Sequence, residues 1–181
     1  MAVTLNETPS GNRLHIGIFG KTNSGKSSFI NTFSGQKVSI VADVAGTTTD
    51  PVYKPMEIYP LGPCILIDTA GFDDEGELGA LRIEKTSLAA QKTELAIILF
   101  CEDEMAQELK WYNYFKKRQT PVIPVLGKAD LYTQEQKEYL IQMIQKNTGE
   151  TVCPVSSETG EGIRKLKELL ADMTLEEKVN Q

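Results

Sequence analysis

Histidine, cysteine and tryptophan are scarce in this chain of 181 residues, which has one histidine, three cysteines and one tryptophan. Cys64, Cys101 and Cys153 stand far apart and none belongs to a CxxC pair, so the spacing of a metal-ligand set is missing. Each lies in an apolar run, where a free cysteine behaves as a small hydrophobic side chain. An odd count in a chain of this size also disfavours a disulfide framework. We expect three buried thiols and no iron–sulfur cluster in this chain.

The chain also has few basic residues relative to acidic ones and no long apolar run. There are 19 lysines and arginines against 25 aspartates and glutamates, a formal charge of -6, and such a chain has no net attraction for a polyanionic backbone. No apolar run approaches the ~18 residues of a membrane span, and residues 1–9 lack the basic start and apolar stretch of a secretory signal. These absences predict a cytoplasmic protein whose partners include no membrane and no nucleic acid.

What the chain does have is a regular alternation of short apolar runs with amphipathic stretches, which is typical of a parallel sheet covered by helices. Strands are predicted at residues 14–19, 52–58, 64–68, 95–101, 121–126 and 152–155. Helices are predicted at residues 25–33, 78–88, 106–118, 134–146 and 162–172. The sequence Tyr59-Pro-Leu-Gly-Pro63 indicates a hairpin turn, which makes one edge pair of strands antiparallel.

Directly after the first predicted strand, residues 20–27 read Gly-Lys-Thr-Asn-Ser-Gly-Lys-Ser and match the pattern GxxxxGK(S/T) in front of a predicted helix. Glycines at positions 20 and 25 let the backbone curl so that successive N–H groups point at phosphate oxygens, beside the positive end of the helix dipole. Lys26 is expected to reach the β and γ phosphates, and the Ser27 hydroxyl to ligate Mg2+. These residues indicate a nucleoside triphosphate site of the P-loop type.

Two later segments complete the expected phosphate site. Asp68-Thr-Ala-Gly71 follows the third predicted strand in a DxxG arrangement, in which the aspartate holds Mg2+ through water and the Gly71 amide senses the γ phosphate. Residues 46–50, Gly-Thr-Thr-Thr-Asp, lack helical periodicity and place a threonine where it could close the Mg2+ shell. Such a loop orders when the γ phosphate is present, so the site is predicted to act as a switch.

The expected base site follows the fifth predicted strand, where Gly127-Lys-Ala-Asp130 replaces the Asn-Lys-x-Asp of a guanine site. Asp130 can accept hydrogen bonds from guanine N1 and N2, which adenine cannot donate, and the stem of Lys128 can cover one face of the base. The missing asparagine removes one or two hydrogen bonds worth roughly 0.5 to 1.5 kcal/mol each, so GTP binding is predicted to be specific but weak. Ser156-Ser-Glu158 stands where a backbone amide would meet guanine O6.

Five motifs in this order predict an α/β fold of three layers, that of the P-loop NTPases with a Ras-like G domain. The six-stranded sheet is expected to be mostly parallel, with one antiparallel edge strand and helices on both faces. We divide the chain into an N-terminal extension at 1–12, a GTP-binding domain at 13–173 and a polar tail at 174–181 that frays or begins a connection. Nucleotide contacts are assigned to Gly20, Asn23, Ser24, Gly25, Lys26, Ser27, Ser28, Lys128, Asp130, Ser156 and Ser157.

Position 72 is Phe, whereas Ras-like enzymes orient the attacking water with a glutamine directly after the DxxG glycine. With Asn23 inside the P-loop and Gly46-Thr-Thr48 downstream, the chain resembles the tRNA-modification GTPases MnmE (TrmE) and the hydrogenase maturation GTPases HydF. The resemblance implies a K+ site made by Asn23, Thr47 and the carbonyls near Ala42 and Val44, which leaves Thr48 for Mg2+. A cation beside the γ phosphate would stabilise the charge that develops there. Catalytic roles therefore fall to Asn23, Lys26, Thr48 and Gly71.

The stretches that match HydF are not general GTPase motifs, and the resemblance covers nearly the whole chain. They are residues 6–17, Asn-Glu-Thr-Pro-Ser-Gly-Asn-Arg-Leu-His-Ile-Gly, together with 50–54 and 73–79. This likeness implies an Mg2+-dependent, K+-stimulated GTPase that acts as a nucleotide switch in assembly and delivery of the di-iron subcluster of FeFe-hydrogenase. The implied partners are GTP and GDP, the hydrogenase, the maturases HydE and HydG, the dimerisation and iron–sulfur domains that follow in HydF, and a second copy through the switch regions.

Three alternatives stay open. MnmE also positions the attacking water with a glutamate after DxxG, and both Glu75 and Glu77 are candidates for that role, with a solvated acidic loop as the alternative. A nucleotide-gated interaction module with negligible turnover would carry the same motifs. MnmE-like tRNA modification is the other function, and the acidic charge and the HydF-like stretches count against it.

Overall fold

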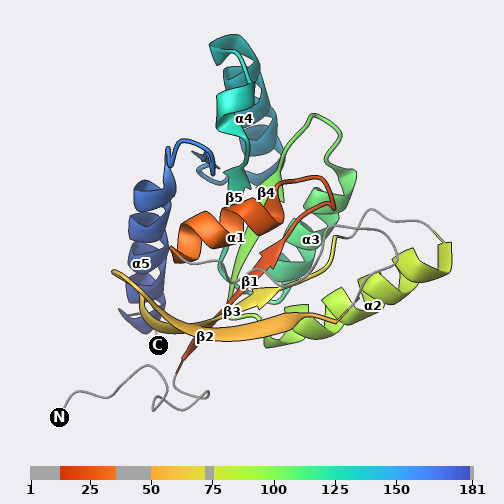
Figure 1. Ribbon diagram of the computed structural model, residues 1–181, viewed down its shortest axis with the longest axis vertical. Helices are drawn as coiled ribbons and strands as arrows, with labels where there is room; N and C mark the ends of the chain where they lie inside the picture. The colour runs from red at the N-terminus through yellow and green to blue at the C-terminus, as the bar shows by residue number, and fades with distance from the viewer. Residues whose placement is uncertain (1–12, 36–49, 72–75, 180–181) are drawn as a thin grey trace.

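The computed structural model describes residues 13–35, 50–71 and 76–179, and for 76–82 and 176–179 it describes the backbone alone. A central sheet lies between two layers of helices (Figure 1). Its strands are β1 (Leu14–Phe19), β2 (Val52–Ile58), β3 (Gly62–Asp68), β4 (Leu95–Phe100), β5 (Val122–Leu126) and β6 (Cys153–Pro154). In the order β2-β3-β1-β4-β5-β6, the pair β2–β3 at one edge is antiparallel and the other pairs are parallel. The fold class predicted from the sequence is confirmed.

The helices divide between the two faces of the sheet. They are α1 (Lys26–Ser34), α2 (Gly76–Lys92), α3 (Ala106–Lys117), α4 (Gln134–Thr148) and α5 (Ile163–Val179), with a 3-10 turn η2 at Ala129–Leu131. Apolar side chains of α1 and α5 form one core cluster with the sheet, and those of α2, α3 and α4 form another on the opposite face. The sheet is therefore covered on both sides, as expected for parallel strands.

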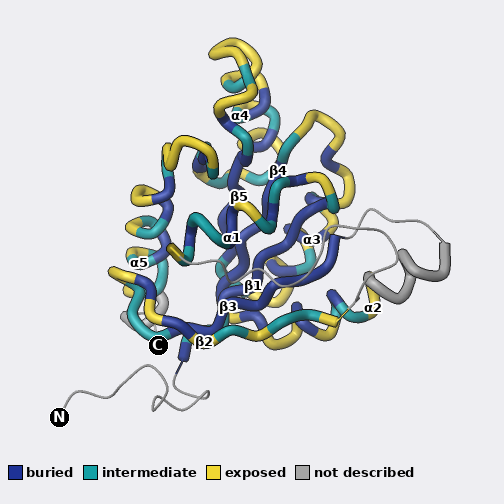
Figure 2. The backbone as a smooth tube through the Cα atoms, in the orientation of Figure 1, coloured by how far each residue is buried: buried dark blue, intermediate teal, exposed yellow. Residues whose placement is uncertain are grey.

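The central strand β4 shows how the sequence produces these two cores. All six of its residues are buried, which Figure 2 shows as a dark blue centre beneath exposed outer helix faces. Because successive side chains of a strand point to opposite faces, alternate residues join different clusters. Leu95, Ile97 and Leu99 pack with α1 and α5, while Ala96, Ile98 and Phe100 pack with α3.

The predicted hairpin is present between β2 and β3, with Val52 opposite Asp68 and Ile58 opposite Gly62. Gly62 has a positive φ of 88°, a conformation that glycine adopts without steric cost. This register brings the last residue of β3, Asp68, to the edge of the sheet where β1 also ends.

Two helices, α2 and α5, extend at least four residues beyond their predicted ends. Helix α2 continues from the predicted end at Leu88 to Lys92, because Ala89 and Ala90 are fully buried against the sheet and prolong its packed face. Helix α5 continues from Asp172 to Val179, so residues 174–179 of the expected polar tail are helical. The hydroxyl of Thr174 donates to the Leu170 carbonyl at 2.9 Å, and Met173 still packs against the core.

Cys64 and Cys153 are buried free thiols as predicted, whereas Cys101 at the end of β4 is only partly buried. Burial raises the pKa of the Cys64 thiol to about 12, so it stays protonated and inert near neutral pH. Within the described residues, no helix has the length and apolarity to cross a membrane.

Candidate functional site

The loop of residues 20–25 connects β1 to α1 at the carboxyl edge of the sheet. It turns through a hydrogen bond from Ser24 N–H to the Lys21 carbonyl at 3.0 Å. Gly25 caps α1 with a φ of 82°, and an added Cβ on Gly20 would lie 2.7 Å from the Ser24 hydroxyl. Both predicted glycines are therefore required by geometry, and the loop presents backbone N–H groups at a helix N-terminus, where anions bind.

Lys26 and Asp68 meet beneath this loop. The Lys26 ammonium lies 3.0 Å from the Asp68 carboxylate, and the two side chains are 0% and 5% exposed. Lysine and aspartate are almost never buried to this degree unless they are paired. The structure thus holds a desolvated cation and a desolvated anion at the point where the sequence predicts phosphate and Mg2+ contacts.

This oxygen set fits Mg2+. The carboxylate of Asp68 and the half-buried hydroxyl of Ser27, next to Lys26, are hard ligands of the kind that Mg2+ prefers. At phosphate sites Mg2+ usually takes one or two protein ligands, and its other positions go to waters and substrate oxygens. No cluster of three or more His, Cys, Asp or Glu residues that could hold a metal occurs in the described part of the chain.

Gly71, the last residue of DxxG, lies directly against the P-loop. A Cβ added at this position would overlap the backbone nitrogen and Cα of Thr22. The segment after β3 therefore approaches the phosphate loop too closely to carry a side chain at position 71, and only glycine fits there.

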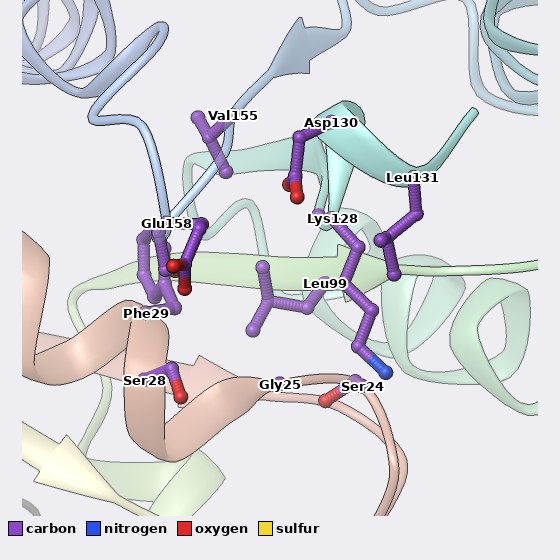
Figure 3. Close-up of a pocket in the computed structure, with 12 residues that line it drawn as sticks. Ser24, Gly25, Ser28, Phe29, Leu99, Lys128, Asp130, Leu131, Val155 and Glu158 are labelled. Atoms are coloured by element: carbon purple, nitrogen blue, oxygen red, sulfur yellow. The ribbon is translucent and has the colours of Figure 1, made fainter. Parts of the chain in front are cut away.

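A cavity of about 320 Å³ opens beside the P-loop and is formed by four stretches of the chain that are distant in sequence (Figure 3). Its size is within the range of small-ligand pockets. It is lined by Ser24, Gly25, Ser28, Phe29, Leu99, Gly127, Lys128, Asp130, Leu131, Val155, Ser157 and Glu158. The Ser24 hydroxyl is buried and makes no hydrogen bond to the described residues.

The side chains of Asp130 and Lys128 are held by hydrogen bonds to two different segments around this cavity. The buried Ser156 hydroxyl donates to the Asp130 carboxylate at 2.7 Å and accepts from Thr159 N–H at 3.1 Å. Lys128 has a positive φ of 57°, and its ammonium donates to the Asn23 carbonyl at 2.5 Å. The carboxylate of Asp130 is thereby oriented while its exposed side leaves room for hydrogen-bond donors of a ligand.

Comparison with known proteins agrees with this geometry. Residues 15–128, more than half of the chain, match the family model described as 50S ribosome-binding GTPase. The chain belongs to this family of P-loop GTPases.

Relatives and solved structures support the assignment. This GTPase domain is 38% identical to GTPase Der of Wolinella succinogenes over 140 residues, covering 74% of the chain and 29% of the relative. It is 33% identical to the tRNA modification GTPase MnmE of Endomicrobium trichonymphae over 172 residues, covering 90% and 36%. The structure of an Era variant from Aquifex aeolicus bound to GDP.AlF4- aligns with a TM-score of 0.74 at 26% identity, covering 87% of this chain and 56% of that one. The chain thus spans about a third of the length of these curated relatives.

The structure of the GTPase domain brings together most of the assigned nucleotide contacts. Six of them line the cavity, namely Ser24, Gly25, Ser28, Lys128, Asp130 and Ser157. Ser156 instead lies behind Asp130, where its hydroxyl orients the carboxylate. Asn23 is exposed at the rim, and its backbone carbonyl accepts from Lys128.

Several predicted positions lie outside the described residues. They are Ala42, Val44, Thr47, Thr48 and Glu75, and for Glu77 the backbone alone is described. The K+ site, the threonine ligand of Mg2+ and the water-positioning glutamate stay predictions.

Sequence reasoning missed other lining residues of the GTPase site. Leu131 lines the cavity and is 69% exposed. Its position directly after Asp130 is the signal in the sequence that could have identified it. Phe29 and Leu99 contribute apolar walls, but nothing in the sequence distinguishes them from ordinary core residues.

Proposed function

We propose that this domain binds GTP with Mg2+ and hydrolyses it to GDP and phosphate. The observation that carries the proposal is the position of the buried Lys26–Asp68 pair next to a base-sized cavity, because the cavity is lined by Ser24 and Gly25, the two P-loop residues that directly precede Lys26. One end of this continuous site suits a polyphosphate, and the other suits a planar heterocycle. A nucleoside triphosphate has both parts in that order.

At the phosphate end, the P-loop amides and the N-terminus of α1 bind the anionic oxygens. Lys26 places its charge between the β and γ phosphates, and Ser27 and Asp68 would hold Mg2+, which neutralises charge that develops on the phosphate oxygens. The Gly71 amide would sense the γ phosphate, and the close approach of Gly71 to Thr22 of the P-loop supports this role. These groups position the phosphate chain before reaction, which is the main source of catalysis in phosphoryl transfer.

At the base end, Asp130 accepts two N–H bonds from guanine, and Ser156 fixes its carboxylate for that purpose. The stem of Lys128 and the exposed Leu131 offer apolar surface to the base. Adenine has no donor at the matching positions, so it would leave the carboxylate without partners.

Isothermal titration with GDP, GTP and ATP, each with Mg2+ in K+ buffer, tests this proposal. We expect heat with both guanine nucleotides and none with ATP. Absence of binding by GDP and GTP, or equal affinity for ATP, would overturn it.

Stimulation by K+ belongs to the same proposal. Asn23 is exposed at the rim of the site, and Lys128 holds its backbone carbonyl. The hydrolysis rate is expected to be higher in K+ than in Na+, and Asn23→Ala should remove that difference. Equal rates in the two buffers would exclude a role for K+.

We further propose that the longer protein acts in hydrogenase maturation, as HydF does. The stretches at residues 6–17, 50–54 and 73–79 support this role because general GTPase motifs do not account for them. Activation of an apo-hydrogenase by the full-length protein together with the HydE and HydG maturases is the test. Activation that needs hydrolysable GTP supports a switch with turnover, whereas full activation with a nonhydrolysable analogue indicates an interaction module.

A tRNA-modification role is the second candidate function. It is favoured by the relatives named tRNA modification GTPase MnmE, which are 33% and 35% identical over 90% and 79% of this chain. The full-length protein would then bind tRNA and restore tRNA modification in cells that lack MnmE. Failure in both of those assays, with activity in hydrogenase maturation, would decide for the first role.

A further inference from the structure

Lys21, the second residue of the P-loop, is tied to the segment that leads from β4 into α3. Its ammonium donates to the Glu102 carboxylate at 2.7 Å, to the Glu104 carboxylate at 2.9 Å and to the Glu104 carbonyl at 2.6 Å. These three bonds use all the protons of a lysine ammonium. The Lys21 side chain is 7% exposed and does not line the nucleotide cavity.

A third carboxylate, that of Glu108 on α3, lies 3.4 Å from the same ammonium. Glu108 is fully buried, and neither of its carboxylate oxygens accepts a hydrogen bond from another described residue. Burial raises the pKa of Glu108 to about 7, although the nearby Lys21 charge opposes the shift. Burial also disfavours the charged form of Lys21, but its bonds to Glu102 and Glu104 outweigh that effect and raise the pKa of Lys21.

The other neighbour of Gly20 is also attached to α3. Phe19 stacks on Trp111 with ring centroids 5.9 Å apart, and its ring lies 5.0 Å from that of Phe115. An apolar contact before Gly20 and an ionic contact after it thus fix the start of the P-loop to a single helix. Gly20 itself has no side chain that could fix the position of the loop.

We propose that Lys21 is a positioning residue for the nucleotide, and that its contacts with Glu104 and Glu108 hold the first half of the P-loop against α3 in the shape that binds phosphate. This inference rests on the proposed GTP site. Glu102 and Glu104 are 52% and 63% exposed, and solvent weakens ion pairs of that kind. The contact with buried Glu108 is screened least, and it is the one of the three that joins Lys21 to a residue of α3 itself.

The test compares Lys21→Met and Lys21→Arg with Lys110→Met as a matched control. Lys110 is an exposed lysine of α3 that takes no part in the contacts between Lys21 and this helix. We expect Lys21→Met to raise the GDP dissociation rate and the KM for GTP roughly tenfold, because small displacements of a binding loop are costly. The kcat at saturating GTP should change less, Lys21→Arg should restore retention, and Lys110→Met should match the wild type.

Glu108→Gln provides a second, independent variant in case Lys21→Met does not fold. It keeps the shape of the buried side chain and removes its charge, so we expect a folded protein that releases GDP several-fold faster. A merely structural role predicts that retention follows thermal stability, whereas the positioning role predicts faster release without loss of stability.

The proposal is overturned if the GDP release rate and the KM for GTP of Lys21→Met stay within twofold of the wild type. If only Glu108→Gln folds, the same result in that variant overturns the proposal. Failure of the wild type itself to bind GDP would instead overturn the proposed function. The two failures are therefore separated by the wild-type titration.

Discussion

The two ends of the nucleotide site are built differently. At the phosphate end, Lys26 and Asp68 form an ion pair that is almost entirely buried, and Gly71 touches the P-loop backbone. At the base end, Asp130 and Leu131 are exposed, and Gly127 contributes no side chain. From this difference we expect the phosphate end to supply most of the affinity for a nucleotide and the base end to supply the selectivity.

The largest expected effect comes from Lys26→Ala. The change removes the cation that is proposed to contact the phosphates and that pairs with buried Asp68, so GDP and GTP affinity should fall at least about 100-fold. Loss of one partner of a buried pair should also lower the free energy of unfolding by about 3 to 5 kcal/mol. Titration calorimetry and urea unfolding measure the two effects. The matched control Lys146→Ala, at an exposed lysine of α4, should change neither the affinity nor the stability. Normal GTP affinity in Lys26→Ala would contradict the view that the phosphate end supplies most of the affinity.

The variant Glu108→Gln tests whether the ionised carboxylate of buried Glu108, which lies beside Lys21 of the P-loop, lowers the free energy of unfolding. Since the folded-state pKa of Glu108 is raised to about 7, its protonated form stabilises the fold at low pH, and this contribution is lost as the pH rises through 7. Between pH 5.5 and pH 8 the wild type should lose about 2 kcal/mol relative to Glu108→Gln. Urea unfolding of both proteins across this range measures the difference, and parallel pH profiles would contradict it.

Asp130→Asn should change selectivity at the base end with little effect on phosphate binding. The amide donates where guanine also donates, so affinity for GDP should fall roughly 100-fold and xanthosine diphosphate should become the preferred ligand. Competition between the two nucleotides in a fluorescence assay checks this outcome. Unchanged GDP affinity would mean that Asp130 does not contact the base.

Gly127→Asn should sharpen the base end by a smaller amount. A Cβ at this position would lie 3.4 Å from the Ser24 carbonyl and 3.7 Å from Leu99, which are ordinary contacts, and Gly127 does not have a positive φ. The new amide can add one or two hydrogen bonds, so GDP should bind several-fold more tightly. Gly127→Ala, which adds only the Cβ, is the matched control, and an equal gain in both variants would assign the effect to packing.

Much of this arrangement could be predicted from the sequence because it depends on local chemistry. The P-loop glycines, the turn between β2 and β3 and the alternation of β4 are each specified by neighbouring residues. Asp130 and Lys128 were also recognisable, because the motif that contains them is short and follows a strand.

Contacts between distant segments could not be predicted in the same way. Lys21 and Glu108 are 87 positions apart, and neither the pair nor the Ser156–Asp130 bond belongs to a pattern that the sequence displays. The end of α5 was placed too early because a run of polar residues reads as a tail, although Thr174 and Met173 still have partners inside the helix and the core.

The bond between the Lys128 ammonium and the Asn23 carbonyl joins the base loop directly to the phosphate loop. A displacement of either loop must therefore strain or carry along the other. Guanosine and inorganic pyrophosphate, supplied as separate molecules, should consequently each raise the affinity of the site for the other. An intact nucleotide, which contains both parts, would gain the same coupling free energy when it binds.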